Sequence, residues 1–439
     1  MMQKIKISGS PSLGLWGATL GFFFGMAAVS LFGPTAHKFE AVMDLSPTMV
    51  GLLVAIPSLS GSLLRIPFGA WVDTTGGKKP FAILMILSII GVAGLMWLVN
   101  THYPAHMTGF YPLVLFFGLL AGCGVATFSV GISQSSYWFP QKQQGFATGT
   151  FGGVGTLAPG LFALLLPIAI TSYGLGISYI AWTIFLIIGT ALYFLMGKNA
   201  PFFQYKKAGM PIADSKLAAQ QKGEELFPTG SIKQSLIESA KIPATWILTA
   251  LYFASFGGFL ALTEWYPNFW RQFYNLKPIE AGVLTAVFSM LSAVIRILAG
   301  PLSDKVGGKR LCLYSMVLLM VSAFGMGLST NFGLSLTFTI LIAIAMGVND
   351  TAVFKMVPKF IPKAVGGASG WIGGIGAFGG FIVPPIMGVI AGKYGKMGYA
   401  WGFEVFVLLA VINILIIWFG MRRRPTAEPV SGNTPGNKQ

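Results

Sequence analysis

Two arginines in apolar surroundings are the residues of this chain whose type and place most directly indicate chemistry. Arg65 and Arg296 each lie inside a long run of hydrophobic residues. An arginine at membrane depth costs between about 3 and more than 10 kcal/mol, so it needs water or an anion beside it. Guanidinium is planar, forked and permanently charged, so it holds a flat oxyanion through two hydrogen bonds. We interpret the two arginines as a site for a small anion.

The other ionisable residues leave these two charges without a partner. The chain has only 13 acidic residues and 3 histidines. We expect Glu264 and Glu404 near outer ends of hydrophobic runs and Asp350 near an inner end, with no acid at the middle of a run. Asp73 and Asp304 lie about 12 Å of helical rise beyond their arginines, which disfavours pairing. We therefore expect the bound anion to supply the missing charge; snorkelling of both arginines to an interface is the alternative.

The composition assigns the chain to a broad class. Of its 439 residues, 54% are hydrophobic and only 10% are charged, whereas soluble domains average about 25% charged residues. These values exclude a soluble enzyme, a disordered chain and a nucleic-acid-binding protein. The formal charge of +16 is better explained by basic residues in cytoplasmic loops of a membrane protein. Both cysteines fall in apolar runs, so no disulfide framework is indicated.

Hydrophobic runs long enough to cross a bilayer predict an all-α membrane protein. A crossing helix needs about 20 mostly apolar residues. We predict twelve spans, at 13–35, 46–70, 80–99, 109–132, 143–170, 176–197, 244–268, 279–303, 310–329, 332–356, 365–392 and 398–421.

A lysine-rich polar stretch divides these spans into two sets of six. We predict an N-terminal bundle at 1–197, a linker with some surface helix at 198–243, a C-terminal bundle at 244–421 and a tail at 422–439. With both termini in the cytoplasm, 22 lysines and arginines fall in cytoplasmic segments and 5 in outer loops. This bias predicts cytoplasmic termini.

The second set of spans repeats motifs of the first. After Arg65 and after Arg296 the same residue types follow at an offset of 231, namely Gly69, Asp73, Gly76 and Lys78 in the first half and Gly300, Asp304, Gly307 and Lys309 in the second. A glycine-rich motif recurs at an offset of 221, with Gly149, Gly152, Gly153 and Gly155 matching Gly370, Gly373, Gly374 and Gly376. Glycines at these spacings let helices approach closely. Duplicated bundles are typical of transporters that bind substrate between their repeats.

The repeated Gly-x3-Asp-x2-Gly-Gly-Lys loop resembles the signature loop of the major facilitator superfamily. The paired arginines and glycine-rich segments resemble, more narrowly, the nitrate/nitrite porter family. The resemblance covers nearly the whole chain and implies two pseudo-symmetric six-helix bundles that work by alternating access. It also implies that the two signature loops act as a cytoplasmic gate.

The narrower resemblance implies further site residues. Phe128 and Phe256 match family positions whose rings sandwich a planar anion, and Tyr252 matches a position whose hydroxyl reaches it. The chain departs from the family at Thr156, where asparagine is usual, and at Gly373, where serine is usual. Both are substrate-contact positions in the family, so these departures leave small carboxylates open as substrates.

We therefore expect a transporter that exchanges small oxyanions, nitrate and nitrite foremost. Antiport of small carboxylates such as formate or oxalate is the alternative, and an anion sensor without transport is a more remote one. We expect no enzymatic activity, cofactor, metal or nucleic-acid partner. The expected unit is a monomer in a bacterial inner membrane, with a small inorganic anion and the lipid bilayer as its partners.

Overall fold

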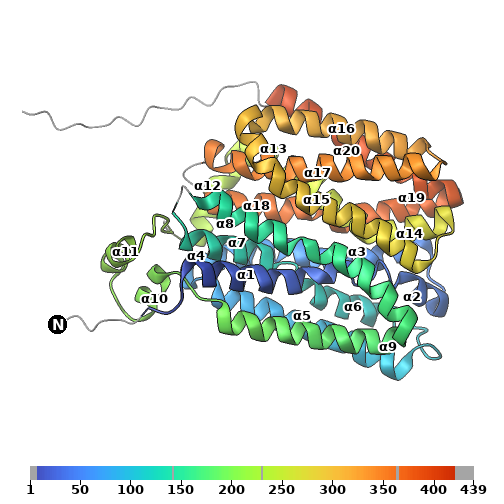
Figure 1. Ribbon diagram of the computed structural model, residues 1–439, viewed down its shortest axis with the longest axis horizontal. Helices are drawn as coiled ribbons and strands as arrows, with labels where there is room; N and C mark the ends of the chain where they lie inside the picture. Colours follow the sequence, from blue (N-terminus) through green and yellow to red (C-terminus); the bar gives the residue numbers. More distant parts are fainter. Residues whose placement is uncertain (1–6, 141–142, 229–230, 362–364, 421–439) are drawn as a thin grey trace, which may run out of the picture.

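The computed structural model describes residues 7–140, 143–228, 231–361 and 365–420, and these residues form helices without a β-strand among them (Figure 1). The first half comprises α1 (Pro11–Met26), η1 (Ala27–Ser30), α2 (Ala36–Met43), α3 (Pro47–Leu63), α4 (Arg65–Thr75), α5 (Lys78–His102), α6 (Tyr111–Ala121), η2 (Gly122–Gly124), α7 (Thr127–Trp138), α8 (Gln144–Gly155) and α9 (Leu157–Met196). The connecting segment contains α10 (Pro201–Lys207), α11 (Ile212–Gln220) and α12 (Ile232–Ala240). The second half comprises α13 (Pro243–Tyr252), the π-helix η4 (Phe253–Gly257), α14 (Gly258–Tyr274), α15 (Pro278–Val306), α16 (Gly308–Leu328), α17 (Phe332–Phe360), α18 (Val365–Ala377), α19 (Gly379–Trp401) and α20 (Glu404–Gly420).

The helical segments account for the twelve predicted spans. Ten segments of the described chain are long and apolar enough to cross a membrane. One of them, Phe146–Met196, has 51 residues and turns at Gly174, where φ is +81°, so it supplies two crossings. The twelfth crossing is the shorter apolar helix α20. Helix ends follow ordinary capping chemistry, since the Ser10 and Ser46 side chains accept bonds from the first turns of α1 and α3.

Several crossings break near their middles. Crossing two divides at Leu64, between α3 and α4, and crossing five divides at Thr156, between α8 and α9. Crossing seven carries the one-turn π-helix η4 between α13 and α14. Such interruptions free backbone groups from the regular helical ladder and are common at functional sites. The breaks place Arg65 at the first residue of α4.

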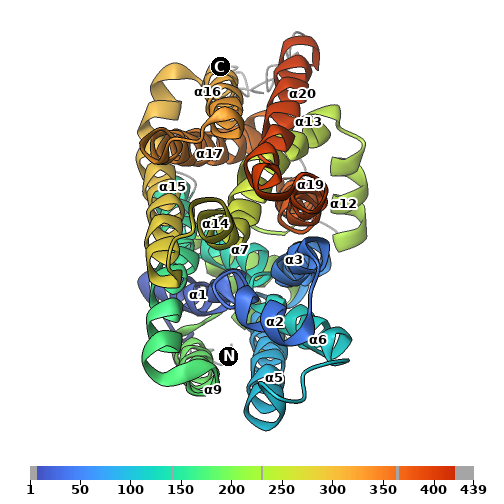
Figure 2. The ribbon, with the colours of Figure 1, turned by 90° about the vertical axis from the view of Figure 1, so that its right-hand side faces the viewer.

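The two halves lie side by side and contact each other along two seams. In Figure 2 the first half occupies the lower part of the view and the second half the upper part. One seam packs α3 against α19, and the other packs α9 against α15. Helix α14 lies between the seams and is buried continuously from Gly258 to Trp270. Within it, the Glu264 carboxylate accepts a hydrogen bond from the Ser58 hydroxyl of α3, in the opposite half.

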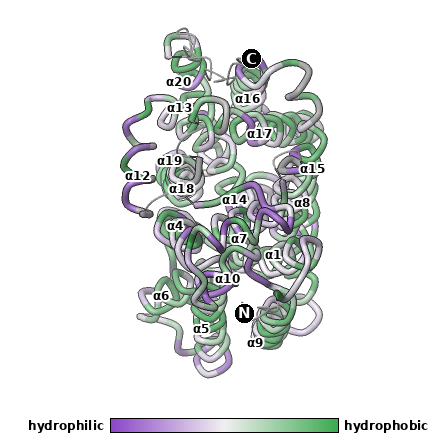
Figure 3. Tube along the Cα trace, turned by 90° about the vertical axis from the view of Figure 1, so that its left-hand side faces the viewer, coloured by the Kyte–Doolittle hydropathy of each residue, from purple (hydrophilic) through white to green (hydrophobic). Residues whose placement is uncertain are grey.

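The connecting segment packs against both halves. Helix α12 contacts α13 and α18 of the second half and α4 of the first, and the Trp371 indole donates to the Leu236 carbonyl at 3.0 Å. Figure 3 shows hydrophilic residues concentrated along α12 and around α10, while the crossings are mainly hydrophobic. Glu224 accepts a bond from the Phe202 N–H at 3.1 Å. Burial of this carboxyl raises its pKa to about 8.

Candidate anion-binding site

Arg65 is fully buried and makes its hydrogen bonds to backbone carbonyls. One guanidinium nitrogen (Nη1) donates to the Gly373 carbonyl of α18 at 3.2 Å, and the other (Nη2) donates to the Val125 carbonyl at 3.4 Å. Gly373 belongs to the second half, so this arginine bridges the two halves. Its Nε has no partner in the described part of the chain. The Arg65 charge therefore meets carbonyl dipoles but no carboxylate there.

Arg296 of α15 has a different set of partners. Its Nη2 donates to the Tyr252 hydroxyl at 3.3 Å, and its Nη1 lies 3.7 Å from Asp350 Oδ2. Its side chain is 12% exposed. The prediction that no acid would neutralise the arginines is therefore wrong for Arg296. Helix α17 continues to Phe360 and packs against α15, and this packing brings Asp350 beside Arg296.

Asp350 belongs to a buried polar network of the second half. Its Oδ1 accepts a hydrogen bond from the Ser255 hydroxyl at 2.6 Å. The Asn349 amide donates to the same Ser255 oxygen at 2.9 Å and accepts from Ser315 at 3.2 Å. All four side chains are buried. The network joins η4, α16 and α17 beneath Arg296 and holds the carboxylate in place.

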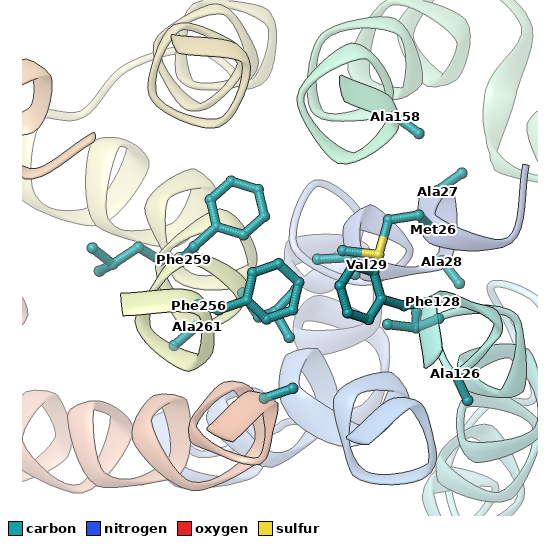
Figure 4. Packing of buried hydrophobic residues seen from close by; sticks show 14 of the residues in the cluster. Met26, Ala27, Ala28, Val29, Ala126, Phe128, Ala158, Phe256, Phe259 and Ala261 are labelled. Carbon is teal, nitrogen blue, oxygen red and sulfur yellow. The ribbon is translucent and has the colours of Figure 1, made fainter. Parts of the chain in front are cut away.

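Aromatic rings from both halves lie beside both guanidinium groups. Phe128 of α7 and Phe256 of η4 face each other with ring centroids 5.9 Å apart, and Figure 4 shows them meeting across the interface. The Arg65 Cζ lies 4.8 Å and 5.0 Å from the Phe128 and Phe256 centroids. The Arg296 Cζ lies 5.7 Å and 5.2 Å from the same two centroids. The geometry thus brings both cations to one pair of rings, at distances typical of cation–π contacts.

Tyr252 and Phe256 form a stacked pair. Their rings are 4.9 Å apart and inclined by only 7°. The π-helix begins directly after Tyr252 and contains both Ser255, which bonds to Asp350, and Phe256, which faces Phe128. The three aromatic residues expected at the site are therefore neighbours.

Thr156 lies at the break in crossing five, whereas Gly373 lies within α18, and the two positions offer different groups. The Thr156 hydroxyl donates to the Gly152 carbonyl at 2.8 Å, so its hydrogen is already used by the helix. The Gly373 carbonyl accepts from Arg65, as described above. A Cβ at Gly373 would lie 3.6 Å from Ser129 Oγ and 3.9 Å from the Phe128 ring. The lack of a side chain at Gly373 therefore leaves room beside Arg65.

Some glycines of the glycine-rich segments allow close packing of side chains, whereas others do not. Most of these glycines lie where a Cβ would press on a neighbouring side chain, with Gly153 against Ile297, Gly155 against Phe22, Gly374 against Ile66 and Gly376 against Tyr252. Three differ from the packing role we predicted. A Cβ at Gly149 would meet nothing within 4 Å, one at Gly370 would make only an ordinary contact with Leu236, and one at Gly152 would lie 3.8 Å from the Arg296 guanidinium.

The first signature loop is bonded to its own half and to the start of the connecting segment. The Asp73 carboxylate accepts from the Tyr137 hydroxyl at 2.6 Å, and the Lys78 N–H donates to the Asn199 side chain at 2.9 Å. Gly69 packs against Ser129, and Gly76 has φ of +78° in the turn after α4. Asp73 thus fastens this loop to α7, and Lys78 fastens it to the segment after α9.

The second signature loop is described only in part. The Asp304 side chain lies outside the part that the structure describes. Gly307 has φ of +89°, which favours glycine at this turn between α15 and α16. A Cβ at Gly300 or Gly307 would meet nothing within 4 Å, and Lys309 is exposed.

The residues missed by sequence reasoning belong to the polar network. The signal for them was the Asn349–Asp350 pair, which interrupts an otherwise apolar run. Ser255 gave no such signal, because a single serine in a membrane helix commonly bonds back to its own helix. No group of three or more His, Cys, Asp or Glu side chains that could hold a metal occurs among the described residues.

Comparison with known protein sequences assigns this chain to a family. The family model described as Major Facilitator Superfamily matches residues 18–328 and 248–439. The chain is 29% identical to the probable nitrate/nitrite antiporter NarK1 of Thermus thermophilus, over 91% of this chain and 89% of that one. It is 27% identical to the nitrite extrusion protein of Bacillus subtilis, over 92% and 94% of the two chains.

Solved structures with the same fold are more distant in sequence. The xylose transporter XylE of E. coli, in a partially occluded inward-open conformation, superposes with a TM-score of 0.70 at 15% identity, covering 93% of this chain and 99% of that one. A bacterial homologue of the human lysosomal transporter Spinster gives a TM-score of 0.63 at 16% identity, covering 95% and 98%. The family match and the twelve crossings in two halves show that this chain belongs to the Major Facilitator Superfamily.

Proposed function

We propose that this protein exchanges nitrate and nitrite across the membrane by alternating access. The observation that carries the proposal is the convergence of Arg65 and Arg296, one from each half, on the same two phenyl rings. A planar oxyanion between the guanidinium groups would receive charge-assisted hydrogen bonds from both. Relatives named for nitrate and nitrite along nearly the whole chain support this choice of anion.

Each proposed site residue has a stated task. The two arginines hold the anion by its oxygens, while Phe128 and Phe256 present flat faces to a flat substrate. Tyr252 orients Arg296 and offers its hydroxyl to the anion. Two further positions, Thr156 and Gly373, form the walls of the site.

The exchange mechanism follows from the charge of the empty site. Without an anion, Arg65 and Arg296 repel each other and oppose the approach of the two halves. An anion replaces this repulsion with two attractions, so the loaded protein closes and can open to the other side. The return of the protein to its first conformation also needs a bound anion. Inward movement of one anion is therefore coupled to outward movement of another anion.

The moving bodies in this proposal are the two bundles, 1–197 and 244–421, joined by the linker at 198–243 and followed by the tail at 422–439. The charge bias supports a cytoplasmic position for both termini and the two signature loops, and we propose a bacterial inner membrane as the location. One chain supplies both arginines, so we propose a monomer as the transport unit, with no cofactor.

Counterflow in proteoliposomes tests the proposal. Vesicles containing the purified protein are loaded with nitrite, labelled nitrate is added outside, and uptake is compared with vesicles that lack an internal anion. We expect uptake only with internal nitrite, a severe loss of uptake in Arg65→Lys and a smaller loss in Arg296→Lys. Arg271→Lys, at the outer end of α14, is the matched control and is expected to keep uptake.

Two results would contradict the proposal. Uptake that survives both arginine substitutions would show that the arginines are structural. Uptake that needs a proton gradient and no internal anion would replace exchange with symport.

The two alternative functions have their own outcomes in this assay. Exchange of formate but not nitrate would show that the same site binds small carboxylates, an alternative favoured by the departures at Thr156 and Gly373. Binding of nitrate without any flux would indicate a sensor.

A further inference from the structure

We propose that Asp350 sets the net charge of the site, so that it accepts anions with one negative charge and rejects those with two. This inference rests on the proposed function and narrows its substrate class to monoanions. Among the described residues, Arg296 has a carboxylate neighbour whereas Arg65 has none.

The charge balance at the site follows from the ionisable groups in contact. The two guanidinium groups contribute two positive charges, and the Asp350 carboxylate contributes one negative charge. No second acid contacts either arginine within the described residues. The empty site therefore has a net charge of one positive unit.

The position of this negative charge is fixed by bonds that do not involve the arginines. Ser255 donates to Asp350 Oδ1 at 2.6 Å, and Asn349 supports Ser255 from the side at 2.9 Å. These groups lie on η4 and α17, both in the second half. The carboxylate consequently cannot move away when an anion enters, and its charge acts on whatever binds.

The contacts of Arg296 leave it able to reach an anion. Its distances of 3.7 Å to Asp350 and 3.3 Å to Tyr252 are long for charge-assisted bonds, which are about 2.7–2.9 Å. If the Arg296 guanidinium turned toward an oxyanion, it would therefore lose little interaction energy with Asp350 and Tyr252. Arg65 has no carboxylate to leave and offers an unpartnered Nε in the described structure.

The consequence for selectivity is electrostatic. A bound monoanion brings the site to neutrality. A dianion would leave one uncompensated negative charge near Asp350 in a region screened far less than water, which is unfavourable. Nitrate, nitrite and formate satisfy this condition, whereas oxalate and sulfate do not. The same fold with asparagine at position 350 would balance a dianion instead.

Competition in the counterflow assay tests this inference. Formate and oxalate are each titrated against labelled nitrate uptake in wild-type protein, Asp350→Asn, Asp350→Glu and the acid-to-amide control Glu404→Gln. We expect formate to compete much better than oxalate in wild type, and the formate-to-oxalate preference to fall by about tenfold or more in Asp350→Asn. Asp350→Glu, which keeps the charge, and Glu404→Gln are expected to retain the wild-type preference.

An unchanged preference in Asp350→Asn would overturn the inference, and so would equal competition by the two anions in wild type. If Asp350→Asn does not fold, thermal unfolding of detergent-solubilised wild type decides instead. Nitrate and formate should then raise the Tm at concentrations where oxalate and sulfate do not, and equal stabilisation by the dianions would overturn the inference. Failure of nitrate counterflow in wild type, by contrast, defeats the proposed exchange.

Discussion

The two arginines occupy equivalent places in the sequence repeat but different places in the structure. Both begin the same signature motif, at an offset of 231. Among the described residues, Arg65 bonds only to backbone carbonyls, one of them from the opposite half, whereas Arg296 bonds to side chains of its own half. The two repeats thus share the cation and its helix but not the counter-charge. The pseudo-symmetric site is asymmetric in its electrostatics.

The difference also concerns motion. The Arg65–Gly373 bond crosses between halves, so any movement of α18 relative to α4 must break or lengthen it. The hydrogen-bonded and ionic partners of Arg296 all move with the second half. We infer that the contacts of Arg65 change as the two halves separate, while Asp350 and Tyr252 hold Arg296 in position for the anion.

The largest expected effect separates the two arginines. Arg65→Lys should weaken nitrate binding by about 100-fold, because lysine loses the forked geometry and the contact to Gly373. Arg296→Lys should cost only about tenfold in binding, since an ammonium can keep the ion pair with Asp350. Isothermal titration of purified protein with nitrate measures both. Equal losses of nitrate affinity in the two variants would show that the different surroundings of the two arginines do not affect binding.

The next effect comes from adding the missing counter-charge to the first half. Ser129 of α7 is buried beside Gly69 and Gly373, and its hydroxyl has no partner among the described residues. Ser129→Asp should place a carboxylate near Arg65, bring the empty site to neutrality and lower nitrate affinity by about 30-fold. Ser129→Asn, of the same shape, is the control in the same titration. A similar loss in both variants would point to crowding instead of charge.

A smaller effect is expected at Tyr252. Tyr252→Phe removes the hydroxyl that accepts from Arg296 but keeps the stack on Phe256. Because that bond is long, we expect a loss of nitrate affinity of about fivefold, below the range for a short hydrogen bond to a charged group. Measuring KM and kcat for counterflow separately places the loss in KM. A collapse of kcat with unchanged KM would indicate a role in the conformational step.

The smallest effect is expected at Thr156. Its hydroxyl hydrogen is engaged by the Gly152 carbonyl, so Thr156→Val should change nitrate affinity by less than about threefold. Thr156→Asn, which adds a free amide donor beside the site, is the informative partner variant. Titration with nitrate compares the two, and a tenfold or greater loss in Thr156→Val would mean that the hydroxyl contacts the anion directly.

Sequence alone determined the features that depend on composition and repetition. Twelve hydrophobic runs, two six-helix halves and the paired arginines could be predicted, because a bilayer demands long apolar helices and tolerates few charges. The resemblance of Phe128, Tyr252 and Phe256 to family positions correctly indicated that these residues are neighbours. The turn at Gly174 was also readable, since a run of 51 residues without a charged side chain is too long for one crossing.

Tertiary structure alone decided which groups share a site. Hydropathy placed Asp350 near a helix end, and only the packing of α17 against α15 brings its carboxylate beside Arg296. The Arg65–Gly373 hydrogen bond joins residues far apart in the chain, so no local pattern predicts it. The π-helix that presents Ser255 leaves no periodic pattern of hydrophobic residues in the sequence. Hydrophobic burial selects helices from local pattern, but the pairing of buried polar groups depends on how those helices meet, which only the packed structure shows.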